Sequence, residues 1–171
     1  MTNRLTSTPT NPILSRFLSM FELNRQRLLE QLEGVSDAML DYTPNAQQVE
    51  TIGTLLDHIA AIDWSWVFED IDGLEMDYPT WKYAFALRSW SEIEQRTGMG
   101  LQFYLDRIAD ERQKIMNRLR QFSDHDLLHE FSTDDGATTF TLEWLLFHLI
   151  NHEAVHIGQI SLLKRLSQLG Q

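Results

Sequence analysis

Apolar residues recur every three or four positions in four separate stretches of the chain, with polar residues between them. This spacing places the apolar side chains along one face of an α-helix. We therefore expect helices over about residues 12–34, 51–72, 100–122 and 141–170. Pro12 suits a first helical turn, Thr51 suits an N-cap, and Gly34 suits the end of the first helix.

The remaining segments do not read as strands, because apolar and polar residues rarely alternate over more than four positions and β-branched residues are sparse. The chain is therefore predicted to be all-α, as a four-helix bundle. The connection from about residue 71 to 99 is long and aromatic, and we expect a crossover with a short helix of its own. Such a crossover lets the second and third helices run in the same direction.

A weak internal repeat supports two similar halves. Val35-Ser36-Asp37, followed by residues 51–58, echoes Phe122-Ser123-Asp124, followed by residues 141–148. Each half then consists of a helix, a loop and a second helix, and the halves are expected to pack against each other.

Length and composition indicate one domain. The chain has 171 residues, of which 43% are hydrophobic, so residues 1–171 are predicted to form a single domain with a flexible segment over 1–11. There is no cysteine. A metal would need nitrogen and oxygen ligands, and any thiol chemistry would need a thiol from solution. A cysteine-free chain also suits the cytoplasm.

The charge distribution narrows the range of partners. The formal net charge is −11, and residues 28–81 contain twelve acidic residues but no lysine or arginine. Such a surface repels phosphate backbones, so we do not expect nucleic-acid binding. No apolar run approaches ~18 residues, and the polar N-terminus does not resemble a signal peptide, so no membrane span is expected.

Two histidines interrupt the apolar stripe of the last predicted helix. His152 and His156 are four residues apart, so both rings leave the same helical face, about 5–6 Å apart at Cβ, close enough to share one metal ion. They occupy core positions of the bundle. The stripe consists of Leu142, Leu145, Leu149, His152, His156, Gln159, Leu163 and Leu166.

His58 is the natural third ligand, because it lies beside the apolar stripe of the second predicted helix. Three neutral imidazoles leave coordination positions for water or substrate, which is typical of a catalytic site rather than a structural one. His148, one turn before His152, is predicted to line the pocket or to hold a ligand in place. His125 and His129 lie in a loop and are expected to be solvated.

Other motifs compete for these residues. His152-Glu153-x-x-His156 has the HExxH form of zinc proteases, but the residues after His156 contain no Asp, Glu or His to complete that site. Glu153-x-x-His156 is also half of a di-iron site whose second half is missing. Asp70-Ile71-Asp72-Gly73 is a calcium-loop fragment without the remaining ligands. A mononuclear histidine site is favoured over all three.

The histidine motifs resemble those of the DinB-like (damage-inducible) family. The resemblance covers about residues 17–166, and one departure is Ile157, where that family often has arginine. The matching segments are Thr51-Ile52-Gly53-x-Leu55-Leu56-x-His58-Ile59-Ala60 and Thr141-Leu142-x-x-Leu145-Leu146-x-His148-x-x-Asn151-His152-Glu153-x-x-His156-x-Gly158-Gln159-Ile160.

This resemblance implies an up-down-down-up bundle, frequently a homodimer, with a divalent metal on His58, His152 and His156. Zinc and nickel are the usual metals, and iron and manganese are further candidates. Related bundles include transferases that use mycothiol, bacillithiol or similar small thiols. A metal that lowers the pKa of a coordinated thiol or water would serve transfer to, or hydrolysis of, a small-molecule substrate.

Two functions follow as hypotheses. The first is a metal-dependent thiol transferase or hydrolase, and the second is a non-enzymatic, metal-binding, stress-response dimer. The individual catalytic residues stay unassigned. Glu153 and Asp57 each neighbour a ligand, but about 100° of helical rotation turns them aside, so we expect them to support a ligand or to be solvated. Gln159 is expected to support a ligand or line the pocket.

Overall fold

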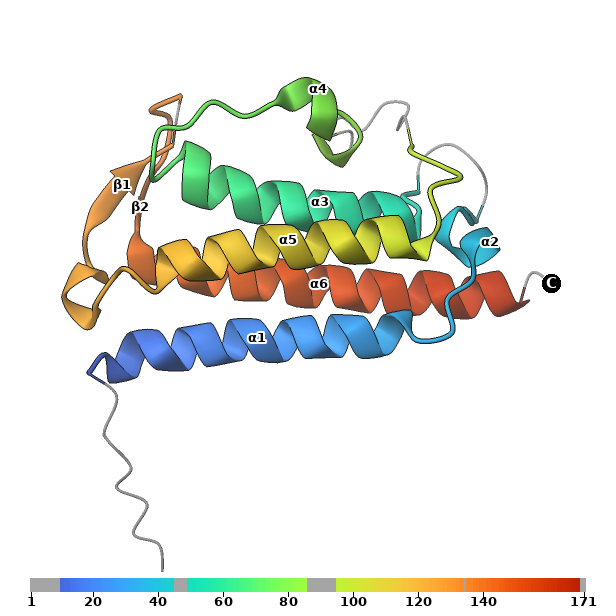
Figure 1. The fold of residues 1–171 in the computed structure, drawn as a ribbon, viewed down its shortest axis with the longest axis horizontal. Coiled ribbons are helices and arrows are strands. Elements are labelled where there is room, and N and C mark those ends of the chain that lie inside the picture. Colours follow the sequence, from blue (N-terminus) through green and yellow to red (C-terminus); the bar gives the residue numbers. More distant parts are fainter. Residues whose placement is uncertain (1–9, 45–48, 86–94, 134, 170–171) are drawn as a thin grey trace, which may run out of the picture.

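The computed structural model describes residues 10–44, 49–85, 95–133 and 135–169. Four long helices lie side by side and form a bundle (Figure 1). These are α1 (Pro12–Leu32), α3 (Ile52–Trp64), α5 (Leu101–Leu119) and α6 (Leu142–Leu169). The predicted all-α class and the four predicted helices are confirmed, with boundaries shifted by a few residues. Most of the predicted flexible segment, residues 1–11, lies outside the described residues.

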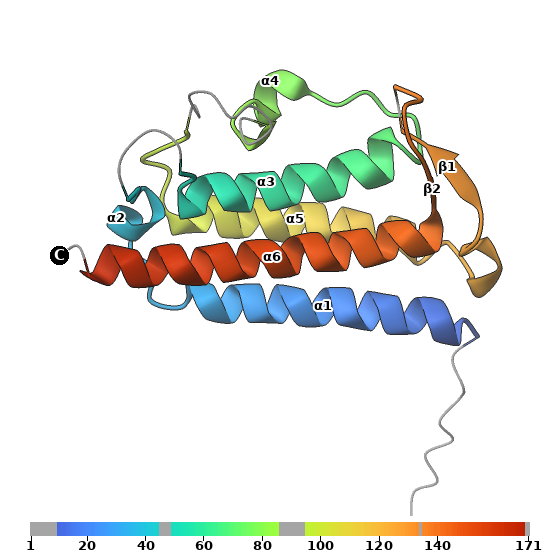
Figure 2. The ribbon, with the colours of Figure 1, turned by 180° about the vertical axis from the view of Figure 1, so that it is seen from behind.

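The helix directions follow the up-down-down-up order. In Figures 1 and 2, α1 and α6 run in one direction, and α3 and α5 run in the opposite direction. The predicted crossover joins α3 to α5 and carries a short helix, α4 (Tyr78–Trp81), over the outer side of α3. Residues 86–94 of that connection lie outside the described part. A parallel α3–α5 pair therefore depends on this crossover.

Hydroxyl side chains begin the corresponding elements of the two halves. Thr51 precedes α3 and accepts a hydrogen bond from Thr54 N at 3.0 Å, while Thr141 accepts one from Trp144 N at 3.2 Å at the start of α6. Ser36 caps the short helix α2 (Asp37–Leu40), and Ser123 caps a 3₁₀ turn over Asp124–Asp126. The internal repeat thus corresponds to equivalent caps in the two halves.

The second predicted helix changes geometry near its end. Its last part is a π-helical turn, η1 (Ser65–Glu69), which continues directly from α3. A π-helical turn inserts extra backbone into the helical repeat and so changes which side chains face the bundle. Ser65, Val67 and Glu69 are buried there.

The expectation of no strand was wrong. Two three-residue strands, β1 (Glu130–Ser132) and β2 (Thr139–Thr141), pair antiparallel between α5 and α6. Phe131 and Phe140 face each other across the pair, with ring centroids 5.9 Å apart. Gly136 turns the chain with φ +68°. Alternation over three residues is too short to show in the sequence, so packing of the two rings decides the local structure.

The apolar stripes form the core as predicted. Leu28, Leu55, Leu145 and Leu149 are fully buried, and the aromatic rings of η1 and the hairpin close one end of the bundle. Helices α3 and α5 approach closely at Gly53, where an added Cβ would lie 2.6 Å from the Tyr104 hydroxyl. None of the described helices has an apolar stretch long enough to span a bilayer.

A buried charge cluster joins all four long helices. Each contributes one ionisable side chain with at most 7% exposure: Arg25 on α1, Asp63 on α3, Arg112 on α5 and Glu153 on α6. Glu153 accepts hydrogen bonds from Arg25 Nε at 2.7 Å and from Arg112 Nη2 at 2.8 Å. Asp63 Oδ2 lies 3.3 Å from Arg112 Nη2 and 3.7 Å from Arg25 Nη2. Two guanidinium groups and two carboxyl groups therefore face one another within the core.

Replacing one carboxylate should destabilise the bundle. Glu153→Gln leaves two buried guanidiniums facing one carboxylate, so we expect the free energy of unfolding to fall by about 3–5 kcal/mol. Urea denaturation of the metal-free protein measures this change. Glu143→Gln, the same substitution at an exposed position of α6, should cost at most about 1 kcal/mol. Equal effects of the two substitutions would contradict the role of the cluster.

Candidate metal centre

The three predicted histidines meet between α3 and α6. Nε2 of His152 lies 3.1 Å from Nε2 of His58 and 3.0 Å from Nε2 of His156. The ligand atoms of the trio all lie within 4.8 Å of one another. The pair four residues apart on α6 thus faces the single histidine of α3, which is an arrangement that could hold one metal ion.

Hydrogen bonds fix the tautomer of two of these rings. Nδ1 of His58 lies 2.7 Å from the carbonyl oxygen of Ala84, and Nδ1 of His156 lies 2.5 Å from Oε1 of Gln159. A carbonyl oxygen only accepts, so both Nδ1 atoms carry the hydrogen and both Nε2 atoms present lone pairs. An acceptor behind the ring in this way is the usual support of a metal-binding histidine.

The surroundings of His152 and His156 favour the neutral imidazole. Burial and, to a smaller extent, the neighbouring imidazoles lower the pKa of His152 to about 2, while burial also lowers the pKa of His156. A proton on any of the rings would face two other rings at short range. The deprotonated form that binds metals is therefore the form that the surroundings favour.

The ring nitrogens are incompletely satisfied by one another. If His152 carries its hydrogen on Nε2, it can donate to Nε2 of His58 or to Nε2 of His156, but not to both. Some of the ring-nitrogen lone pairs therefore point at one another. In the part of the chain that the structure describes, its Nδ1 is buried without a hydrogen-bond partner. A cation between the three Nε2 atoms removes this conflict, and the donor set therefore fits a divalent metal.

Three imidazole nitrogens make up the candidate donor set. Over residues 10–44, 49–85, 95–133 and 135–169, no carboxylate joins the three-histidine group. A divalent ion held only by these imidazoles would have at least one position for an exchangeable ligand.

His148 extends the row of rings along α6. Its ring stacks on Trp144 at 4.9 Å, lies 4.9 Å from Trp66 of η1, and is 5.9 Å from the ring of His152. Burial lowers the pKa of His148, so this ring is also neutral. It stands outside the converging trio and forms an aromatic wall next to it.

Glu153 and Asp57 belong to ion pairs rather than to solvent. Glu153 has no exposed surface, and both of its oxygens accept from arginines, as described above. Asp57 is 1% exposed, with Arg96 Nε at 3.2 Å and Arg107 Nε at 3.3 Å. Neither carboxylate is solvated. Burial raises the pKa of Asp57, and the two guanidiniums oppose this rise.

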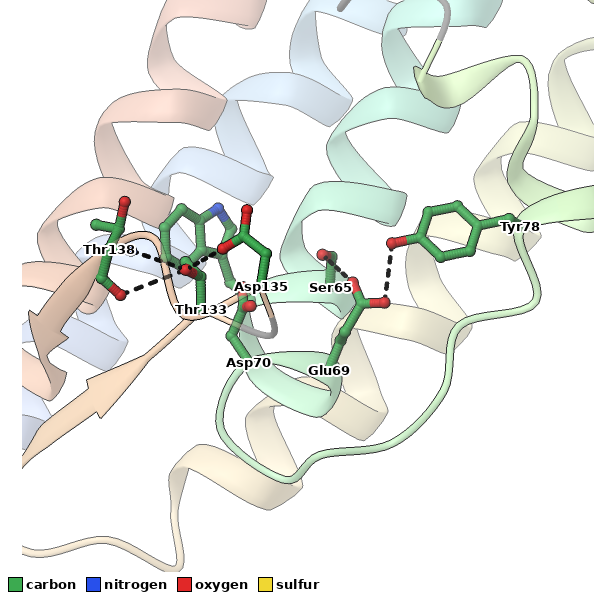
Figure 3. A pocket seen from close by; sticks show the side chains of 8 residues that line it. Ser65, Glu69, Asp70, Tyr78, Thr133, Asp135 and Thr138 are labelled. Atoms are coloured by element: carbon green, nitrogen blue, oxygen red, sulfur yellow. Dashed lines mark hydrogen bonds between the residues drawn. The ribbon is translucent and has the colours of Figure 1, made fainter.

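A separate hollow lies between η1 and the hairpin (Figure 3). Its volume is about 230 Å³, and Trp66 is one of its lining residues. Glu69 is held there by the Ser65 hydroxyl at 2.7 Å and by the Tyr78 hydroxyl at 2.9 Å. Trp66 therefore lies between this hollow and the ring of His148.

Comparisons with known proteins agree with this architecture. The family model of the DinB superfamily matches residues 20–160. Among solved structures, the chain resembles a conserved protein from Enterococcus faecalis with a TM-score of 0.67 and 17% identity, covering 92% of this chain and 97% of that one. At this identity the likeness shows the fold alone. No curated protein matches the chain.

The family match begins within α1, ends within α6 and includes His58, His152 and His156. The chain therefore belongs to the DinB superfamily.

Proposed function

We propose that this protein is a metal-dependent enzyme with a mononuclear, open three-histidine site on His58, His152 and His156. The observation that carries the proposal is the convergence of three Nε2 atoms, two of which have lone pairs fixed by acceptors behind their rings. A structural site would be closed by a fourth protein ligand.

The reaction that suits this site is transfer of a small thiol, or hydrolysis. A bound divalent ion lowers the pKa of a thiol or water that it coordinates. The chain has no cysteine, so the thiol would come from solution. The rings of His148, Trp66 and Trp144 would exclude water on one side and pack against an apolar part of a substrate. A cytoplasmic location, where small thiols stay reduced, is part of this proposal.

Zinc and nickel are the preferred metals of the proposal. Imidazole suits zinc, nickel and iron, whereas manganese prefers carboxylate and water ligands. The HExxH hydrolase alternative needs a carboxylate beside the bound water. Glu153 gives it little support, because both of its oxygens are occupied by Arg25 and Arg112.

Histidine replacement tests the ligand assignment. His58→Ala, His152→Ala and His156→Ala should each lose most of the bound metal, because two imidazoles hold a divalent ion much more weakly than three. Elemental analysis of dialysed protein measures metal per chain. His125→Ala is the matched control and should keep the wild-type content, while His148→Ala should mainly change affinity. Unchanged metal in all three ligand variants would show that the assignment is wrong.

A turnover assay separates the enzyme from the non-enzymatic alternative. The wild-type protein, offered mycothiol or bacillithiol with a panel of electrophiles, should consume thiol at a rate that falls to the background after chelation. Restored metal should restore the rate, except in the His152→Ala variant. Metal-loaded protein with every coordination position filled by protein atoms, and without turnover, would instead favour a metal-binding stress-response dimer.

We also propose that the protein is a homodimer that pairs through the outer face of α6. Large apolar side chains are exposed along one stripe of this helix, at Trp144, Phe147, Val155 and Leu162, with exposures of 44–58%. The stripe carries no charge between these positions. A chain with net charge −11 repels its own copies over most of its surface, so an uncharged stripe is where a second copy would pack.

A charge placed in the stripe should separate the copies. Val155→Glu puts a carboxylate opposite its symmetry mate in a two-fold interface, and we expect monomers at concentrations where the wild type is dimeric. Analytical ultracentrifugation measures the mass. Gln168→Glu, the same charge at an exposed site outside the stripe, should stay dimeric. A wild-type protein that sediments as a monomer would contradict the dimer.

A further inference from the structure

The acceptor that orients His58 belongs to the crossover between α3 and α5. The carbonyl oxygen of Ala84 receives the Nδ1 hydrogen of His58 at 2.7 Å. Ala84 is fully buried and lies shortly after α4. The geometry of one predicted ligand therefore depends on a segment that is not part of any long helix. Whatever holds this segment in place also holds the ring of His58.

Arg107 of α5 joins the crossover to α3. Its guanidinium lies over the ring of Trp81, 3.8 Å from the centroid, and its Nη2 donates to the carbonyl oxygen of Thr80 at 3.4 Å. Its Nε lies 3.3 Å from Oδ1 of Asp57, the residue before His58. Trp81 is 7% exposed and Asp57 is 1% exposed, so both contacts lie in the protein interior.

These contacts link the two ends of one continuous path, from Asp57 on α3 to its neighbour His58. It runs from Asp57 on α3 to Arg107 on α5, then to Thr80 and Trp81 of the crossover, and back through Ala84 to His58. Arginine suits position 107 because its planar guanidinium can stack on an aromatic ring, donate to a carbonyl and pair with a carboxylate at the same time. Arg96 adds a second donor to the Thr80 carbonyl at 3.2 Å.

We infer that Arg107 is a positioning residue that holds the crossover so that the Ala84 carbonyl keeps His58 in its metal-binding tautomer. This inference rests on the proposed three-histidine site and assigns a residue that the motif does not contain. Arg107 acts through Thr80, Trp81 and Ala84, and its effect on the metal should pass through His58 alone. An effect confined to one of three ligands distinguishes positioning from general stabilisation.

A double-mutant cycle measured by zinc titration tests this path. Arg107→Ala should weaken zinc binding about 10- to 100-fold, the usual effect of losing a supporting contact. In the His58→Ala background, where His152 and His156 keep a weaker site, Arg107→Ala should change affinity less than about twofold. An equal loss in both backgrounds would overturn the inference, since general loosening of the fold does not depend on His58.

Arg118→Ala is the matched control. Arg118 lies on the same helix, stacks over Phe122 at 4.3 Å and pairs with Asp72 at 2.8 Å, so its removal deletes the same charge and a similar contact. It should leave zinc affinity at the wild-type value. A loss as large as that of Arg107→Ala would again contradict positioning through the crossover.

The tautomer of His58 provides a readout that does not involve metal. Nitrogen-15 NMR of the metal-free wild type should show the Nδ1-protonated ring, and Arg107→Ala should show a mixture of tautomers. If that variant does not fold, Arg107→Lys keeps the charge opposite Asp57 without the planar stack and serves instead. A purely Nδ1-protonated ring in the folded variant would refute the inference. A wild-type protein without zinc at the three histidines would refute the proposed function itself.

Discussion

The buried cluster of Arg25, Asp63, Arg112 and Glu153 is the constraint on which the candidate site depends. Each member comes from a different long helix, so the four helices can satisfy their charges only at one rotation and one axial position. Glu153 directly follows His152 on α6. Because consecutive residues are about 100° apart around a helix, holding Glu153 toward α1 and α5 turns the ring of His152 toward α3.

This cluster specifies register more than it adds stability. Burial, opposed by Arg112 and Arg25 and reinforced by the nearby Glu153, raises the pKa of Asp63 to about 7. The ionised cluster is therefore costly to bury, and apolar residues of similar size would pack at least as well. If only apolar side chains met here, α6 could slide or rotate into other positions of similar packing energy. With the cluster present, each of those positions would leave a buried charge unpaired and is therefore disfavoured. The cluster thereby turns the candidate ligand His152 toward His58 on α3.

The sequence predicts the helices and the three histidines because both leave periodic signals. His152 and His156 stand on an apolar stripe, and so does His58. Arg25 and Arg112 had a similar signal that sequence analysis missed, since Arg25 follows Phe21 by four residues and Arg112 follows Ile108 by four. The role of the Ala84 carbonyl left no signal in the sequence. Every residue has a backbone carbonyl, and only the path of the crossover brings this one to His58. The hairpin was missed because three-residue strands are shorter than any reliable alternation.

The segment His152-Glu153-x-x-His156 shows how helix packing determines the chemistry that a motif can perform. In a zinc protease, the glutamate of this motif must reach the water beside the metal. Here the same spacing occurs on α6, but two arginines on α1 and α5 hold both oxygens of Glu153 in the core. The motif supplies two candidate ligands from one face of α6 and a buried structural carboxylate from another. The presence of Arg25 and Arg112 on facing helices, rather than the motif itself, separates these two uses of the glutamate.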